Sequence, residues 1–188
     1  MKTVFFDVDT QIDFVVPTGA LYVPGAEKRI AAVAALNRHA AARGIPVIST
    51  MDAHAEDDPE FRTWPAHCVK GTLGQRKPES TILEKRAVLP AGIGGAQQIV
   101  VEKQSLNCFD SPHLAPLLEQ LAADRYVVYG FVTEYCVRFA AEGLLKTGKR
   151  VEIVTDAVEC LRREDAGRTF AAFTAAGGVL TTVAEVCR

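Results

Sequence analysis

The stretch Thr3-Val-Phe-Phe-Asp-Val-Asp-Thr-Gln-Ile-Asp-Phe14 contains the feature that decides the fold. Its first half, residues 3–8, is a short run of mostly apolar residues without helical spacing, which is typical of a strand buried on both faces. Asp9 follows directly, where such a strand ends. This is the pattern of an open α/β sheet, in which ligands bind beyond the carboxyl ends of the strands.

Similar strands recur along the chain, and helical segments separate them. Apolar residues at i, i+3, i+4 and i+7 predict helices over residues 114–121 and 137–145, and residues 26–42 and 164–176 form two further helical segments that stop before glycines. The six predicted strands are residues 3–8, 45–50, 99–102, 126–131, 151–154 and 179–183. This alternation predicts a doubly wound α/β fold: a mostly parallel six-stranded sheet with helices on both faces, in a Rossmann-like layering.

One segment does not follow this rhythm. Residues 51–98 carry proline, glycine and charge without sustained periodicity, and an aperiodic stretch of that length in a compact domain is usually functional. We expect residues 1–188 to form a single domain in which this excursion covers or builds a site. The 48% of apolar and 23% of charged residues are those of an ordinary globular protein.

The charge balance gives no reason to expect a polyanionic partner. Twenty-one Lys and Arg oppose 23 Asp and Glu, so the formal net charge is -2, and we expect neither nucleic acid nor a membrane as partner. No segment approaches the ~18 consecutive apolar residues of a membrane span, and acids interrupt the N-terminal run too early for a signal peptide. We therefore expect a cytoplasmic protein whose five scattered cysteines are reduced.

Three reactive side chains are predicted to meet at one edge of the sheet. Asp9 ends the first strand, Lys103 ends the third, and Cys136 follows the fourth through Gly130-Phe-Val-Thr-Glu-Tyr. Thr133 is a candidate N-cap, which would place the thiol at the positive end of a helix dipole. An adjacent Lys103 would lower the pKa of the thiol and hold it as a thiolate at neutral pH, and Asp9 would accept the thiol proton.

Each of these residues also has an ordinary interpretation. Cys136 fits a buried hydrophobe, Lys103 a solvated charge at a strand end, and Asp9 a turn residue. Asp7 and Asp13 are alternatives to Asp9 as the reactive acid, although Asp9 lies nearer the carboxyl edge than Asp7.

A candidate metal site follows the second predicted strand. Asp52 and His54 are two residues apart and share one side of an extended chain, and Glu60 and His67 follow within the excursion. Nitrogen and oxygen ligands of this kind suit zinc, iron or manganese rather than calcium. The same residues also fit loop histidines bonded to water beside a solvated acidic run over residues 56–60, so spacing alone leaves metal binding open.

Five motifs carry a resemblance to a known family. They are Asp9-Thr-Gln-Ile-Asp-Phe14, Asp52-Ala-His54, Trp64-Pro-Ala-His67-Cys68, Lys103 and Gly130-Phe-Val-Thr-Glu-Tyr-Cys136-Val. Together they resemble the nicotinamidase/pyrazinamidase branch of the isochorismatase-like cysteine hydrolases, in order from the first strand to past Cys136. The second and third motifs are the narrower signal, because members that act on other substrates are not expected to carry this metal site.

The resemblance implies a role for each matching residue. The implied catalytic residues are Asp9, Lys103 and Cys136, and the implied oxyanion hole is formed by the N–H groups of Val132 and Cys136, after a cis peptide bond between Phe131 and Val132. The implied metal ligands are Asp52, His54, Glu60 and His67, with Asp57 or Asp58 as the alternative to Glu60. The implied substrate contacts are Phe14 and Trp64.

The implied enzyme is a metal-containing cysteine amidohydrolase with an isochorismatase-like fold. It would convert nicotinamide and water to nicotinate and ammonia through a Cys thioester. Its cofactor would be one divalent transition metal, with zinc as the first choice and iron or manganese as alternatives, and its partner a small amide, with a homo-oligomer possible. The alternatives are a hydrolase of another small amide or carbamoyl compound, and a catalytically silent metal- or ligand-binding member of the fold.

Overall fold

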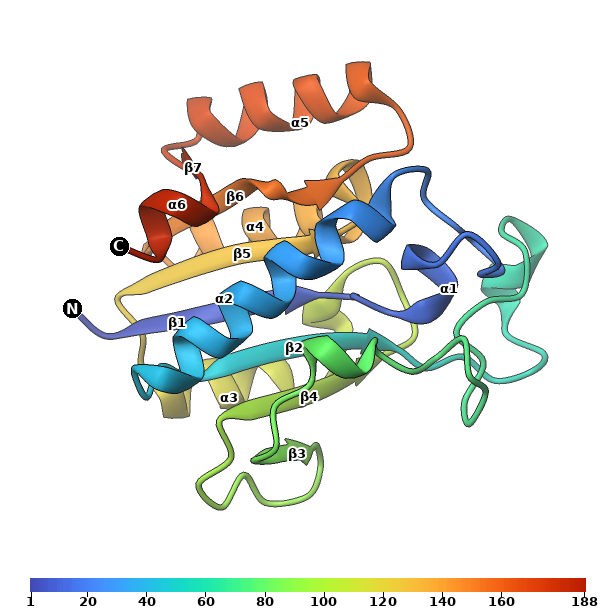
Figure 1. The fold of residues 1–188 in the computed structure, drawn as a ribbon, viewed down its shortest axis with the longest axis horizontal. Coiled ribbons are helices and arrows are strands. Elements are labelled where there is room, and N and C mark those ends of the chain that lie inside the picture. The colour runs from blue at the N-terminus through green and yellow to red at the C-terminus, as the bar shows by residue number, and fades with distance from the viewer.

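Seven parallel strands form the centre of the protein, in the order β3-β4-β2-β1-β5-β6-β7 (Figure 1). The computed structural model describes residues 1–188. The strands are β1 (Thr3–Val8), β2 (Val47–Asp52), β3 (Arg86–Val88), β4 (Gln98–Lys103), β5 (Arg125–Phe131), β6 (Arg150–Glu159) and β7 (Val179–Thr181). The predicted class, a doubly wound α/β fold with a parallel sheet, is confirmed, with seven strands in place of six.

The additional strand is β3, at the edge of the sheet beside β4. It has three residues, of which Arg86 and Val88 are exposed and Ala87 is half-buried, so it carries none of the apolar run that marks a buried strand. It lies inside the aperiodic segment 51–98, which therefore contributes to the sheet as well as to the site. β6 also extends to Glu159, beyond the predicted end at residue 154.

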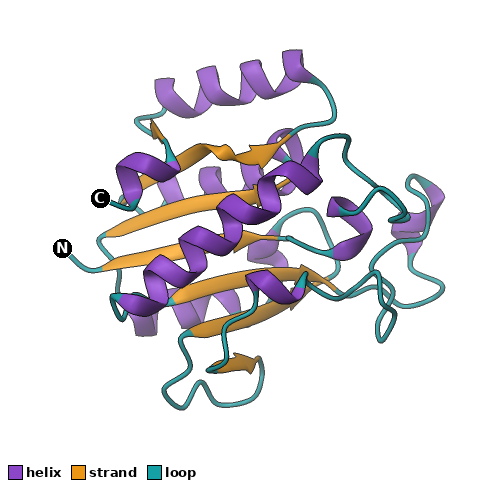
Figure 2. Ribbon diagram, viewed as in Figure 1, coloured by secondary structure: helices purple, strands orange, loops and turns teal.

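Helices cover both faces of this sheet (Figure 2). One face carries α1 (Ile12–Val15), α2 (Ile30–Ala42) and α6 (Val183–Val186), and the other carries α3 (Leu114–Leu121), α4 (Arg138–Leu145) and α5 (Arg163–Ala175). Successive residues of β1 point to opposite faces, so Phe5 packs in one core and Phe6 in the other. The expected two-sided burial of this strand is thus confirmed.

Short turns complete the secondary structure. Four are 3-10 turns, at Ala26–Arg29, Pro59–Arg62, Glu79–Thr81 and Cys108–Asp110, and one is a π-helical turn, at Thr133–Val137. Two of the 3-10 turns lie inside the segment 51–98, as does β3, and the first part of this segment extends past the carboxyl end of β2 (Figure 1).

The strand order reverses beside β1, which fixes where a ligand can bind. β1 connects to β2 on one side, whereas β4 connects across both of them to β5 on the other side of β1. The crevice outside the carboxyl ends of β1 and β5 is therefore the topological switch point of the sheet, where open α/β folds bind their ligands.

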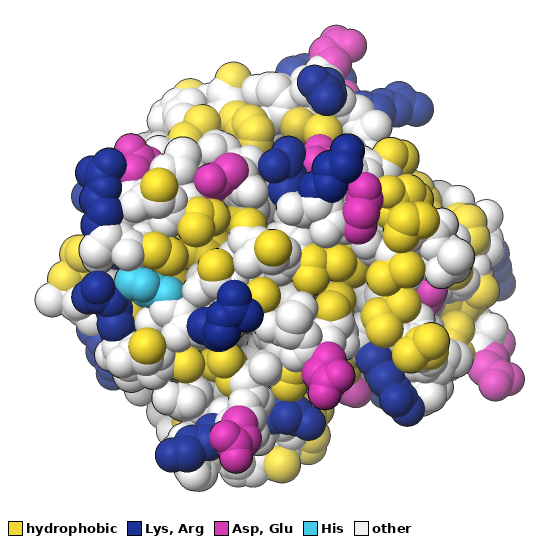
Figure 3. Space-filling view, viewed as in Figure 1, with side chains coloured by type: hydrophobic (Ala, Val, Ile, Leu, Met, Phe, Trp, Pro, Cys, Tyr) yellow, Lys and Arg dark blue, Asp and Glu magenta, His cyan; other side chains and the backbone are white.

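The surface shows no concentration of a single charge on the face in Figure 3, where Lys, Arg, Asp and Glu side chains are scattered among apolar ones. None of the helices has the length and apolar character needed to cross a bilayer.

Candidate active site

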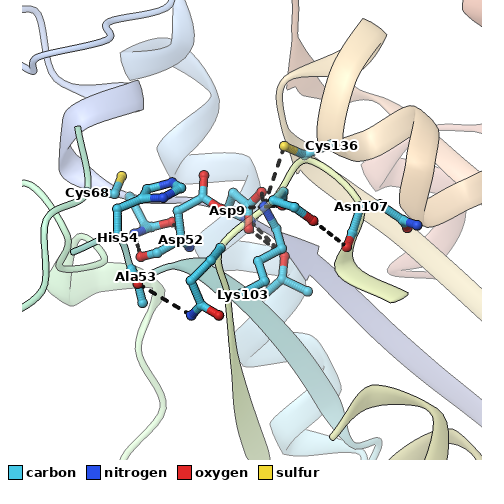
Figure 4. Close-up of polar contacts among 12 residues, drawn as sticks. Asp9, Asp52, Ala53, His54, Cys68, Lys103, Asn107 and Cys136 are labelled. Carbon is cyan, nitrogen blue, oxygen red and sulfur yellow. Dashed lines mark hydrogen bonds and ion pairs between the residues drawn. The ribbon is translucent and has the colours of Figure 1, made fainter. Parts of the chain in front are cut away.

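Four side chains from four different chain segments meet at this switch point (Figure 4). Asp52 and Lys103 are the last residues of β2 and β4, Asp9 follows β1, and Cys136 lies in the π-helical turn after β5. The Lys103 Nζ atom lies 2.9 Å from Asp9 Oδ2 and 3.7 Å from Cys136 Sγ, and it also donates a hydrogen bond to Asp52. All four side chains are buried, so this is a buried cluster of one ammonium, two carboxyl groups and a thiol.

Asp9 is held in a conformation that few non-glycine residues adopt. Its φ of 45° lies in the left-handed region, which costs about 1–3 kcal/mol and is concentrated at functional sites. Its N–H donates to the Thr50 carbonyl at 3.3 Å, and the Thr50 hydroxyl donates to Asp9 Oδ1 at 2.6 Å. The second oxygen, Oδ2, is therefore left facing Lys103.

The two alternative acids have other contacts. Asp7 accepts hydrogen bonds from the Ser49 hydroxyl at 2.9 Å and from Lys77 Nζ at 3.1 Å, in a buried network on β1. Asp13 accepts from the N–H of Cys68 at 2.7 Å and from the N–H of Ala20 at 3.0 Å. Both acids therefore anchor the chain around the crevice, and the acid beside the thiol is Asp9.

The charges of the cluster depend on each other. Burial alone would lower the pKa of Lys103, but the carboxylates of Asp52 and Asp9 outweigh it and hold that pKa well above its ordinary value. Burial raises the pKa of the Cys136 thiol well above its ordinary value; Lys103 opposes this, while Asp9 and Asp52 add to it. Lys103 thus shifts the pKa of the thiol in the predicted direction, but burial outweighs it, so the structure does not support the expected thiolate at neutral pH.

The predicted N-cap at Thr133 is wrong. The turn Thr133–Val137 is π-helical, and α4 begins only at Arg138. The Thr133 hydroxyl donates instead to the carbonyl of Glu159 at 2.8 Å, which ties the turn to the end of β6. The peptide bond between Phe131 and Val132 is cis, as the resemblance implied.

A second cluster adjoins the first through Asp52. One ligand atom each from Asp52, His54 and His67 lies within 4.8 Å of the others, and all three side chains are buried. Nε2 of His54 has no hydrogen-bond partner. Nδ1 of His67 lies 2.7 Å from the carbonyl of Pro65, so Nε2 is the nitrogen of His67 that remains for a ligand. Burial lowers the pKa of His67, which favours the neutral imidazole that a metal requires. Two imidazoles and a carboxylate fit a divalent transition metal.

The fourth proposed ligand lies beside this cluster. Glu60 Oε1 is 3.9 Å from His67 Nε2, so Glu60 lies beside the group formed by Asp52, His54 and His67. Asp58, the alternative, instead contacts Nδ1 of His54, the nitrogen that points away from the candidate ligand set. Asp57 is exposed. Of the three acids, Glu60 is the one that faces the cluster.

A narrow, mostly apolar pocket opens between the two clusters. Phe14 and Trp64, the predicted substrate contacts, both line it; the Phe14 ring lies 5.5 Å from the His67 ring, and Trp64 contacts Tyr135 edge to face at 5.5 Å. The full lining is Phe14, Leu21, Val23, Asp52, Glu60, Trp64, His67, Leu106, Phe131, Val132, Tyr135, Cys136 and Leu161. A thiol and residues of the candidate metal set thus border one mostly apolar pocket.

Sequence reasoning missed residues that hold these groups in place. Gln11 is fully buried and bonds the main chain of Asp52 and of Gln75. Glu134 Oε1 accepts the N–H groups of Leu161 at 2.9 Å and Arg162 at 2.8 Å, which fixes the loop that places Leu161 in the pocket wall. Their only signal was a polar residue inside a motif, which does not reveal what it bonds.

The chain is similar to known proteins over almost its whole length. A family model described as the Isochorismatase domain matches residues 3–185. The nicotinamidase of Escherichia coli (strain K12) is 27% identical over 205 residues, covering 95% of this chain and 93% of that protein. The pyrazinamidase of Pyrococcus horikoshii, solved in complex with zinc, is 28% identical with a TM-score of 0.82, covering 97% and 99%. The N-carbamoylsarcosine amidase of Thermoplasma acidophilum is 27% identical with a TM-score of 0.81, covering 97% of each chain.

Proposed function

We propose that this chain, which belongs to the isochorismatase family, is a metal-containing cysteine amidohydrolase that converts nicotinamide and water to nicotinate and ammonia. The nicotinamidase and pyrazinamidase among its relatives agree with the branch that its motifs resemble. The observation that carries the proposal is that the thiol cluster and the candidate metal cluster share Asp52 and border one pocket. This arrangement can hold an aromatic ring at one end and attack its carboxamide at the other.

The first half of the proposed reaction forms a thioester. Asp9 accepts the proton of the Cys136 thiol, and the sulfur attacks the carboxamide carbon. The N–H groups of Val132 and Cys136 donate to the oxygen as it becomes negative. Asp9 then gives its proton to the leaving nitrogen, the C–N bond breaks, and ammonia departs.

The second half regenerates the enzyme. Asp9 takes a proton from a water molecule, and the water oxygen attacks the thioester carbon. The C–S bond then breaks, Asp9 returns its proton to the departing sulfur of Cys136, and the acid is released. Lys103 supports both halves, because its ammonium contacts Asp9 and lies 3.7 Å from the sulfur on which negative charge develops. Burial of this cluster strengthens that attraction.

Asp52, His54 and His67 would hold one divalent transition metal, with Glu60 beside them. Such a metal, if held by these residues, would supply a Lewis acid to which a pyridine nitrogen could bind. Zinc is the first choice, since the related pyrazinamidase was solved with zinc, and iron and manganese accept the same ligand types. Phe14 and Trp64 pack against the ring and orient its carboxamide toward Cys136.

A second candidate is hydrolysis of a carbamoyl compound by the same thiol. It is favoured by the similarity to the N-carbamoylsarcosine amidase, which reaches nearly the same identity and TM-score as the pyrazinamidase. The apolar walls of the pocket favour an aromatic amide instead. A catalytically silent binding protein would have no need of the buried acid, ammonium and thiol.

Ammonia release from a panel of nicotinamide, pyrazinamide, an aliphatic amide and N-carbamoylsarcosine tests the proposal. We expect nicotinamide to be the best substrate, activity to fall on chelation and zinc to restore it. Cys136→Ala should lower turnover at least about 10³-fold. Cys108→Ala, which removes another buried thiol, is the matched control and should retain activity. Full activity of Cys136→Ala would remove the nucleophile, and a preference for the carbamoyl compound would favour the second candidate.

A further inference from the structure

The carboxylate of Asp58 makes two contacts in the excursion, one with each oxygen. Its Oδ2 atom lies 2.9 Å from Nδ1 of His54, and its Oδ1 atom accepts the N–H of Glu60 at 2.9 Å. Asp58 directly precedes the 3-10 turn Pro59–Arg62, which carries Glu60. One side chain therefore connects a candidate metal ligand at the end of the sheet to the segment that bears a second.

The first contact fixes how the His54 ring is protonated. An ionised carboxylate can only accept, so the ring nitrogen facing Asp58 carries the hydrogen and Nε2 presents its lone pair. Nε2 is buried without a partner and belongs to the group formed with Asp52 and His67. The ring is fully buried, and Phe61 packs against it edge to face at 5.4 Å. Position and tautomer of His54 are thus both set from the side away from the ligand group.

His67 is arranged in the same way by a different partner. Its Nδ1 faces the carbonyl of Pro65 at 2.7 Å, which also leaves Nε2 for a ligand. Both histidines of the cluster therefore present the same nitrogen, and both outer partners come from residues 51–98. The difference is that the partner of His54 is a charged side chain that can be changed by substitution.

We propose that Asp58 is a positioning residue of the metal site and not one of its ligands. It holds His54 with Nε2 directed to the metal, and through the N–H of Glu60 it sets that carboxylate beside His67, where Oε1 lies 3.9 Å from Nε2. A carboxylate behind a ligating imidazole fixes the ring and raises its basicity. The inference rests on the proposed function, because it concerns the same metal site.

A purely structural role for Asp58 makes different predictions. As an N-cap of a short turn, it would contribute about 1 kcal/mol to stability and nothing to the protonation of a distant ring. The tautomer of His54 and the metal affinity of the protein are therefore the two properties that separate positioning from capping. Thermal stability alone does not separate them.

The experiment compares Asp58→Ala and Asp58→Asn with Asp57→Asn. Asp57 is exposed and adjacent, so its substitution removes the same charge at almost the same place without touching His54. Asn at position 58 keeps one carbonyl oxygen and can accept from the ring or from the Glu60 N–H, but not from both. It is therefore the conservative variant that should restore part of what Ala removes.

The first readout is the tautomer of His54 in the metal-free protein, by long-range 1H–15N NMR of the ring nitrogens. The chain has four histidines, and the spectrum of His54→Gln assigns the signal. We expect the Nδ1–H form in the wild type and in Asp57→Asn, and a mixture with the Nε2–H form in Asp58→Ala.

The second readout is the zinc dissociation constant, by competition with a chromophoric chelator. Asp58→Ala should weaken binding 10–100-fold, in the range typical of lost outer partners, Asp58→Asn by less, and Asp57→Asn by no more than about twofold. A wild-type chain that does not bind zinc would overturn the metal site of the proposed function and this inference with it. A wild-type chain that binds zinc while Asp58→Ala binds it equally tightly, or keeps the Nδ1–H form, would overturn the inference alone.

Discussion

Gln11 and Asp52 are joined by two hydrogen bonds between the amide of one and the main chain of the other. The Gln11 Oε1 atom accepts the Asp52 N–H at 2.7 Å, and Nε2 donates to the Asp52 carbonyl at 2.9 Å. The same Nε2 donates to the carbonyl of Gln75 at 2.8 Å. One buried amide thus connects the segment after β1, the end of β2 and the excursion, so the Asp9 side of the site and the metal side share a fixed frame.

Gln11→Glu should disrupt this frame with almost no change in side-chain shape. A carboxylate cannot donate to the carbonyls of Asp52 and Gln75, and it adds a buried charge, so we expect the free energy of unfolding to fall by about 2–4 kcal/mol. Gln97→Glu is the control, because Gln97 is only half-buried and donates one long bond, to Ala41 at 3.2 Å. Urea unfolding of both variants measures the difference in the free energy of unfolding. Equal values would show that the hydrogen bonds of Gln11 do not contribute to stability.

Much of the fold is predictable because buried strands and helices have recognisable local patterns of apolar residues. The runs that form β1, β2, β4 and β5 each contain consecutive apolar residues that are buried on both faces, and such runs can be recognised without tertiary information. β3 has no such apolar run, because it pairs along one edge only and exposes Arg86 and Val88. Thr133 failed as a predicted cap because its hydroxyl bonds to Glu159, 26 residues away, which cap chemistry cannot foresee.

Some residues of the candidate site can likewise be predicted from the sequence, and others cannot. Asp9 and Lys103 are found by asking which polar residues end a strand, since parallel strands bring their carboxyl ends to one edge. The contacts of Asp58 and Gln11 depend on how residues 51–98 return to the sheet, and an aperiodic segment carries no pattern that specifies its path. The roles of the site residues remain predictions, which the variants above test.

Gly130 lies where β5 approaches β1 too closely for any side chain. A Cβ at this position would lie 2.0 Å from the Val8 carbonyl oxygen, and the φ of +117° is itself strained for other residues. Gly130→Ala should therefore lower the free energy of unfolding by more than about 3 kcal/mol. Gly167→Ala, inside α5 with nothing within 4 Å, should instead gain about 0.5–1 kcal/mol. Chemical denaturation compares the two, and a tolerated Gly130→Ala would contradict the close approach.

Glu152, at the start of β6, supplies a pH-dependent part of the stability. Burial would raise its pKa, but hydrogen bonds from Arg125, at 2.8 Å to Nε, and from Arg150, at 2.6 Å, outweigh burial and lower the pKa below the ordinary 4.5. The folded protein then binds fewer protons than the unfolded chain, so this contribution is complete above about pH 4.5 and is lost as the pH falls through the lowered pKa.

Glu152→Gln should therefore cost about 1–2 kcal/mol at pH 7 and progressively less in acid. Glu164→Gln is the matched control, since Glu164 pairs with Arg168 on the surface and should cost under about 0.5 kcal/mol at any pH. Urea unfolding at pH 7 and at about pH 3 measures both. A loss that does not change with pH would mean that packing, not the two arginines, accounts for it.

Lys103→Met removes the only cation that contacts both Asp9 and Asp52. The free energy of unfolding should fall by about 3–5 kcal/mol, because two buried carboxyl groups lose their partner. The pKa of the Cys136 thiol should rise further, since Lys103 is the group that lowers it, and alkylation of Cys136 by iodoacetamide should slow at least about tenfold. Lys77→Met breaks the other buried ion pair, with Asp7, and should lose comparable stability while alkylation is unchanged. Peptide mass spectrometry follows the alkylation. An unchanged alkylation rate in Lys103→Met would show that the ammonium does not affect the reactivity of the Cys136 thiol.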